Sequence, residues 1–164
     1  MAQRAGGHAL AAAVRLLSVK RLTKARLAQK LADRGYDPDA VRDAVDECER
    51  RKYVDDRAFA QLHVRSALDR KPVGRLVLLR DLVRNGIDAD LAAEILDEAD
   101  RDEDERIDRA LAKFVAMRPQ DSYGQLGRRL ERAGFGAPSI ARALRRRAES
   151  RGPLPGADEF EEIS

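Results

Sequence analysis

Apolar residues recur along the chain at helical spacing, and one arrangement of them occurs three times. In each copy two leucines stand four positions apart, a glycine follows the second leucine, and a large, mainly apolar residue comes directly after the glycine. This order predicts a helix that ends at the glycine, because glycine readily adopts the left-handed conformation that closes helices. The copies lie about 50 residues apart, a period typical of arrays of small helical units. The copies are Leu27, Leu31, Gly35 and Tyr36; Leu78, Leu82, Gly86 and Ile87; and Leu126, Leu130, Gly134 and Phe135.

Each motif has a longer apolar-periodic segment before it and a further one after it. Helix-capping residues mark the expected starts, among them Thr23, Asp37 with Pro38, and Ser122 with Gln125. No window shows the alternation typical of strands. The expected helices cover about 9–19, 24–34, 38–50, 56–70, 75–85, 89–99, 107–117, 123–133 and 138–148.

The sequence therefore predicts an all-α protein. We expect three tandem three-helix repeats that form an elongated, curved array, because one unit alone buries little apolar surface. The expected parts are a flexible N-terminus over residues 1–8, repeats over 9–53, 54–100 and 101–149, and a disordered acidic tail over 150–164.

Composition narrows the class of protein. Of the 164 residues, 43% are hydrophobic and 37% are charged, a mixture suited to helices with wet outer faces. The single cysteine, Cys48, excludes an internal disulfide framework and indicates a reducing compartment. The apolar segment 9–19 contains Arg15 and is too short to span a bilayer. We expect a cytoplasmic monomer that does not enter membranes.

Residues that usually carry catalysis are sparse. The chain has two histidines, of which His8 lies near the start and His63 stands beside an apolar helix face. We interpret His63 as a boundary residue and Cys48 as a buried core residue. Because no nucleophile is paired with a base, the sequence predicts neither enzymatic activity nor a cofactor.

One acidic stretch resembles the start of a calcium-binding loop. Asp100, Asp102 and Asp104 have the required spacing. The likeness then ends, since Glu105 stands where the loop needs glycine and Leu111 where it needs the closing glutamate. We interpret the stretch as a solvated linker and predict no metal site.

Positive charge is concentrated in two stretches, residues 65–84 and 128–147, although the net charge of the chain is only +3. Two interpretations of these stretches remain open. The first is structural, because arginine is a good helix former and is favourable near helix C-termini. The second is functional, because arginine also binds phosphates or acidic protein surfaces. Aromatic residues do not alternate with the cations, which argues against stacking on single-stranded bases. The candidate contact residues are Arg65, Arg70, Lys71, Arg75, Arg80, Arg84, Arg128, Arg129 and Arg132.

With the three units laid out, the chain resembles the RecX family of bacterial recombinase regulators over about residues 9–148. The segment between the first two units is the most specific part of the likeness. Two positions depart from the family pattern, Cys48 in place of a larger aliphatic residue and Gly136 in place of a polar cap. The matching residues outside the leucines and glycines are Arg34, Tyr36, Asp37, Tyr53, Val54, Asp55, Asp56, Phe59, Ala60, Val77, Ile87, Asp88 and Phe135.

The resemblance implies a non-enzymatic regulator of recombination, DNA repair and the SOS response. Such a protein binds the RecA–DNA filament, inhibits the ATPase and strand-exchange activities of RecA, and obstructs filament extension. The implied partners are the RecA filament and single- or double-stranded DNA. The alternative that the residues leave open is a helical-repeat protein that binds nucleic acid directly, without a recombinase.

Overall fold

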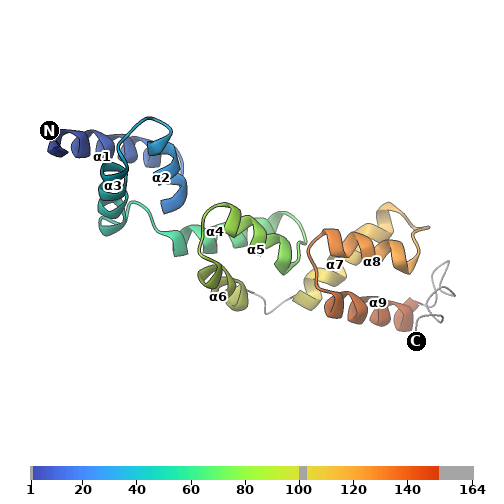
Figure 1. Cartoon of the computed structure of the whole chain (residues 1–164). Coiled ribbons are helices and arrows are strands. Elements are labelled where there is room, and N and C mark those ends of the chain that lie inside the picture. The colour runs from blue at the N-terminus through green and yellow to red at the C-terminus, as the bar shows by residue number, and fades with distance from the viewer. Residues whose placement is uncertain (1, 100–102, 152–164) are drawn as a thin grey trace. The chain divides into compact units, whose positions relative to one another are not determined.

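The computed structural model of this chain describes residues 2–99 and 103–151, with side chains from His8 to Ser150, and these residues form helices and no strands (Figure 1). Each segment predicted to be helical is helical, so the all-α prediction is confirmed. The number of repeats stays a prediction. The helices are α1 (Ala2–Val19), α2 (Lys24–Ala32), α3 (Pro38–Arg50), α4 (Asp56–Arg70), α5 (Arg75–Arg84), α6 (Ala89–Ala99), α7 (Glu103–Met117), α8 (Tyr123–Arg132) and α9 (Ala137–Arg151).

The largest differences from the expected bounds are at α1, α7 and α9. Helix α7 begins at Glu103 rather than at 107, so it includes the last part of the acidic stretch interpreted as a linker. Helix α1 begins at Ala2 rather than near residue 9, so it extends into the segment predicted to be a flexible N-terminus. Helix α9 continues to Arg151, past the predicted start of the acidic tail. The rest of that tail, 152–164, and residues 100–102 of the acidic linker lie outside the described residues.

The predicted capping residues form hydrogen bonds at the helix N-termini. The hydroxyl of Thr23 accepts a hydrogen bond from the backbone N–H of Arg26 at 3.1 Å. Ser122 and Gln125 form the reciprocal capping box. Such caps satisfy N–H groups that have no partner inside the helix. The carboxylates of Asp37, Asp55 and Asp88 cap α3, α4 and α6 in the same way.

Backbone hydrogen bonds explain the fixed spacing between the second leucine and the glycine of the motif. Gly35, Gly86 and Gly134 have φ angles of 80°, 83° and 91°, in the left-handed region. In each turn the residue after the glycine donates its N–H to the carbonyl of the second leucine, as Ile87 does to Leu82 at 3.1 Å. The glycine itself donates to the carbonyl three residues before it. These two bonds define a Schellman motif, which fixes the distance between leucine and glycine.

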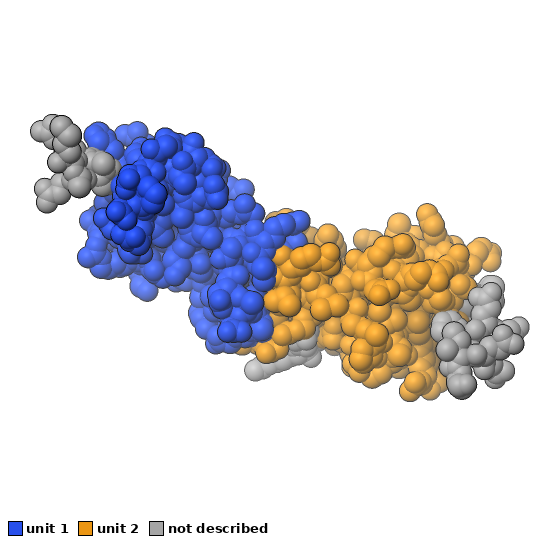
Figure 2. All heavy atoms as spheres, viewed as in Figure 1, with its two compact units in different colours: residues 1–63, 81–95 blue, residues 64–80, 96–164 orange. Residues whose placement is uncertain are grey.

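Two compact units make up the chain (Figure 2). Unit 1 comprises residues 1–63 and 81–95, and unit 2 comprises residues 64–80 and 96–164. The boundaries fall inside α4, α5 and α6, so the segment expected as the second repeat contributes to both units.

Each unit has a core built around motif leucines. In unit 1, α1 and α2 pack on α3, and Leu27, Leu31 and Cys48 are fully buried. In unit 2, α7, α8 and α9 pack on one another. There Leu126 and Leu130 are fully buried. The residue after the glycine also packs inward, since Ile87 and Phe135 are buried and Tyr36 is half-buried against the core of unit 1.

Candidate functional site

A hydrogen-bonded junction joins the start of α2 to the end of α5 within unit 1. The fully buried hydroxyl of Thr23 donates to the carbonyl oxygen of Asn85 at 2.5 Å. The guanidinium of Arg26 donates to the carbonyl of Arg84 at 2.6 Å. The last carbonyls of α5 have no partner inside their own helix, so these donors satisfy them.

Unit 2 contains the corresponding junction between the start of α5 and the end of α8. The backbone N–H of Gly74 donates to the carbonyl of Ala133 at 2.9 Å, and that of Leu76 donates to the carbonyl of Gly134 at 3.0 Å. Gly74 precedes Leu78 by four residues, as Thr23 precedes Leu27, and Ala133 precedes Gly134 directly, as Asn85 precedes Gly86. A Cβ atom on Gly74 would lie 2.1 Å from the carbonyl group of Gly134, so the close approach requires glycine.

The glycine turn in the first copy of the motif, at Gly35, has no such junction among the described residues. A Cβ atom on Gly35 would meet no heavy atom within 4 Å. Sequence reasoning identified the three glycines as helix ends but missed the junctions. One sequence signal could have indicated the junctions. Each motif has an equivalent residue four positions before its first leucine, namely Thr23, Gly74 and Ser122.

The Asp55–Asp56 segment, the most specific part of the resemblance, is a joint inside unit 1. The carboxylate of Asp56 accepts the backbone N–H of Lys24 at 2.8 Å, at the start of α2. Burial raises the pKa of the Asp56 carboxyl above its ordinary value, while the bond from Lys24 acts in the opposite direction. The ammonium of Lys24 contacts Glu49 at 2.8 Å, and this hydrogen bond raises the pKa of Lys24. These residues therefore connect α2, α3 and α4.

The candidate cations around the α4–α5 connection divide into two groups. Arg75 forms a 2.8 Å ion pair with Asp97, and its side chain is only 28% exposed. Arg84 pairs with Asp81 at 2.8 Å, and Arg70 donates to the hydroxyl of Ser66 at 2.8 Å. The exposed candidates without a salt bridge in the described part of the chain are Arg65, Arg70, Lys71 and Arg80.

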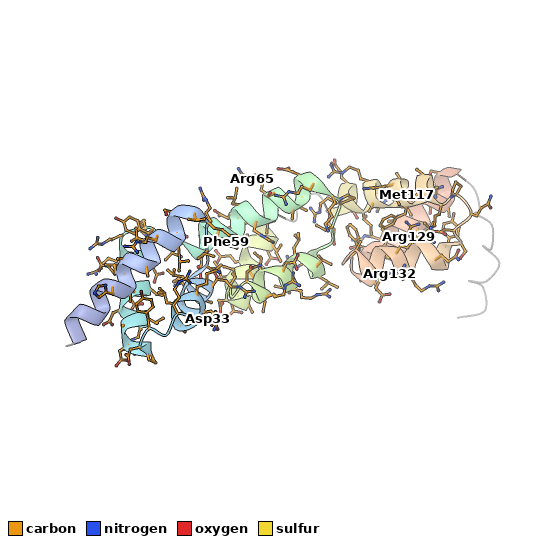
Figure 3. The ribbon with its side chains drawn as sticks, turned by 90° about the horizontal axis from the view of Figure 1, so that it is seen from above. Asp33, Phe59, Arg65, Met117, Arg129 and Arg132 are labelled. Atoms are coloured by element: carbon orange, nitrogen blue, oxygen red, sulfur yellow. The ribbon has the colours of Figure 1, made fainter. Side chains whose placement is uncertain are left out.

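The three candidates on α8 also differ in their contacts, and two of them, Arg129 and Arg132, are labelled in Figure 3. The guanidinium of Arg129 contacts the carboxylate of Asp121 at 2.7 Å, and both side chains are largely buried, at 16% and 11% exposure. The same guanidinium lies 4.5 Å from the centre of the Phe114 ring, a cation–π contact. Arg129 therefore holds α8 to α7, while Arg128 and Arg132 are exposed.

The structure also places the residues that were considered for chemistry. Cys48 is buried, and burial raises the pKa of its thiol. His63 is half-buried, and its ring stacks on Phe59 with the ring centres 6.0 Å apart. Among the residues with defined positions, no group of His, Cys, Asp or Glu has the arrangement of a metal site. No helix in the described ranges is long and apolar enough to cross a membrane.

Two family models match the chain. The model for the first three-helix domain of RecX covers residues 9–48, and the model for the second three-helix domain covers residues 55–96. The regulatory protein RecX of Pelodictyon phaeoclathratiforme is 30% identical over 155 residues, which are 93% of this chain and 94% of that protein. The chain belongs to the RecX family. This confirms the resemblance identified from the motifs.

Further RecX proteins support the assignment. The regulatory protein RecX of Halorhodospira halophila is 32% identical over 150 residues, 87% of this chain and 91% of its own. A crystal structure of RecX from Lactobacillus salivarius superposes with a TM-score of 0.80 at 19% identity, and covers 88% of this chain and 97% of that one. That likeness shows a shared fold. The family consists of regulatory proteins and is not a known enzyme class.

Proposed function

We propose that this protein binds the RecA–DNA filament as a monomer and inhibits RecA ATPase activity, strand exchange and filament extension. The observation that carries the proposal is the similarity to a regulatory protein RecX over 93% of the chain. A regulator of this kind needs a binding surface rather than catalytic groups, in agreement with the helical units described above.

The exposed cations provide the contact residues of the proposal. Arginine and lysine side chains bind DNA phosphates and acidic protein surfaces, and such charges set orientation and association rate. Cations with an internal carboxylate partner, such as Arg75 and Arg129, first have to lose that contact, so we rank them below the exposed ones. The proposed contacts are Arg65, Arg70, Lys71, Arg80, Arg128 and Arg132.

The test is the ATPase activity of RecA assembled on single-stranded DNA. We expect the purified protein to slow ATP hydrolysis when it is added at or below the concentration of RecA. A second measurement follows filament extension from a preformed nucleus by light scattering, which separates an effect on growth from an effect on hydrolysis. Unchanged hydrolysis and unchanged extension at equimolar protein would contradict the proposal.

Direct nucleic-acid binding is the second candidate function, and the exposed cations on α4, α5 and α8 favour it. The same protein is titrated against labelled single- and double-stranded DNA without RecA at several salt concentrations. Affinity for phosphates falls steeply with salt because counterions are released on binding. Tight, salt-sensitive DNA binding combined with no effect on RecA would select this candidate.

A further inference from the structure

The open glycine turn of the first repeat differs from its two counterparts. At Gly86 the chain at the start of α2 lies close, with the Cβ of Ala25 only 2.3 Å from where a Cβ on the glycine would be. At Gly134 the backbone N of Val77 lies 2.6 Å from the corresponding position. Gly35 has no such neighbour. Neighbouring residues therefore cover the glycine turns at Gly86 and Gly134, whereas the turn at Gly35 is open.

A pocket of about 550 Å³ adjoins the open turn. It lies within unit 1, between α1 and the end of α2, and the two residues on either side of Gly35 both line it. Val19 lines it while being 87% exposed, an unusual exposure for a large apolar side chain. The apolar part of the lining is Ala12, Leu16, Val19, Leu22 and Tyr36.

The rest of the lining is entirely cationic, and no described Asp or Glu contributes to it. One of the four cations has a fixed orientation, since the guanidinium of Arg34 donates to the carbonyl of Lys30 at 2.9 Å. None of the four forms a salt bridge within the described residues. The cations are Arg15, Lys20, Lys30 and Arg34.

We propose that this pocket binds an acidic segment of another protein. Apolar side chains of the segment enter the pocket, and its carboxylates pair with the surrounding cations. The apolar lining favours a polypeptide over nucleic acid, because a phosphate backbone would use the cations and leave Val19 and Leu16 exposed. The proposal is independent of the proposed RecA contacts, since its residues lie in α1, α2 and the turns that follow them.

The experiment measures fluorescence anisotropy of a labelled acidic peptide, in which Glu and Asp alternate with Phe and Leu, during titration with the full chain. The substitutions Lys20→Glu and Lys30→Glu together should weaken binding at least about tenfold, because opposite charges become like charges. Val19→Ser should weaken it about threefold or more through lost apolar burial. The matched control combines Arg42→Glu with Arg50→Glu, the same charge change on exposed residues of α3 outside the pocket, and should bind like the parent protein.

Two further probes decide what the pocket recognises. In the first, Ser replaces Phe and Leu in the peptide; equal binding of this probe would overturn the proposal, because charge alone would then explain it. The second is a single-stranded oligonucleotide of equal charge. Tighter binding of that probe, lost in the Lys20 and Lys30 double variant, would instead assign the surface to nucleic acid. No binding of the acidic peptide at about 1 mM, the weak limit of specific recognition, would also overturn the proposal. Circular dichroism confirms that each variant folds.

Discussion

The hydroxyl of Thr23 donates a 2.5 Å hydrogen bond to the carbonyl oxygen of Asn85, which lies 62 residues further along the chain. The same hydroxyl accepts the N–H of Arg26 and so caps α2. The buried hydroxyl of Thr23 thus makes both a local capping bond and a long-range bond. Gly74 makes the corresponding long-range bond to Ala133 through its backbone N–H.

Thr23→Val should destabilise the fold by about 2–3 kcal/mol, because it removes a helix cap and leaves a buried carbonyl without its donor. Thr23→Ser keeps the hydroxyl and should cost less than about 1 kcal/mol. Urea unfolding followed by circular dichroism measures both. Ser122→Ala is the matched control, since Ser122 caps α8 without a long-range hydrogen bond among the described residues, and it should cost about 1 kcal/mol. Equal losses at Thr23 and Ser122 would argue against the junction.

The three motif glycines should respond differently to alanine, although their φ angles are nearly the same. Gly35→Ala should cost about 1–2 kcal/mol, the penalty for a left-handed residue with a Cβ atom in open space. Gly86→Ala and Gly134→Ala should cost about 1–3 kcal/mol more, because the new methyl group meets Ala25 or Val77. Thermal and urea unfolding give the order. A larger loss at Gly35 than at Gly86 would contradict the close approach.

The ion pair between Arg129 and Asp121 should be a stabilising contact. Asp121→Asn removes the charge that faces a largely buried guanidinium, and we expect a loss of about 2–3 kcal/mol. Asp39→Asn breaks a 2.9 Å pair with Arg42 in which both side chains are mostly exposed, and it should change stability by less than about 1 kcal/mol. Unfolding in urea compares the two variants. Similar small effects would return Arg129 to the group of free surface cations.

Inhibition of RecA should depend on the exposed cations of unit 2. We expect Lys71→Glu with Arg80→Glu, and separately Arg128→Glu with Arg132→Glu, to raise the protein concentration for half-inhibition of the ATPase at least about tenfold. Arg109→Glu with Lys113→Glu is the control, because these exposed residues of α7 carry the same charge change and are outside the candidate set. If all three double variants inhibit equally, the candidate cations do not contact the filament.

Cys48 should be unreactive in the folded protein and should make stability depend on pH in alkali. Burial raises the pKa of its thiol above the ordinary value of 9.0. As the pH rises past 9.0, the unfolded chain therefore loses this proton first, and the free energy of unfolding falls until the folded thiol also ionises. Cys48→Ala should remove that part of the pH dependence. A disulfide reagent at pH 8 should label the native thiol slowly and the unfolded thiol at once; rapid native labelling would show that the site is open.

Local sequence determined the helices and most of their ends. Capping residues such as Thr23 and Ser122, and glycines such as Gly86, act on backbone groups within a few residues, so their effect is readable without a fold. The apolar periodicity identified buried leucines for the same reason. The family followed from the order of these signals.

Only the tertiary structure decided which residues meet across the chain. Nothing near Thr23 in the sequence indicates Asn85, and nothing near Arg129 distinguishes it from Arg128 and Arg132, because ion pairs and close contacts depend on how helices pack. The open turn at Gly35 and its cationic pocket became visible only when the two covered glycines could be compared with it. The repeated motif thus ends a helix through local backbone interactions, and tertiary packing determines which residues cover each helix end.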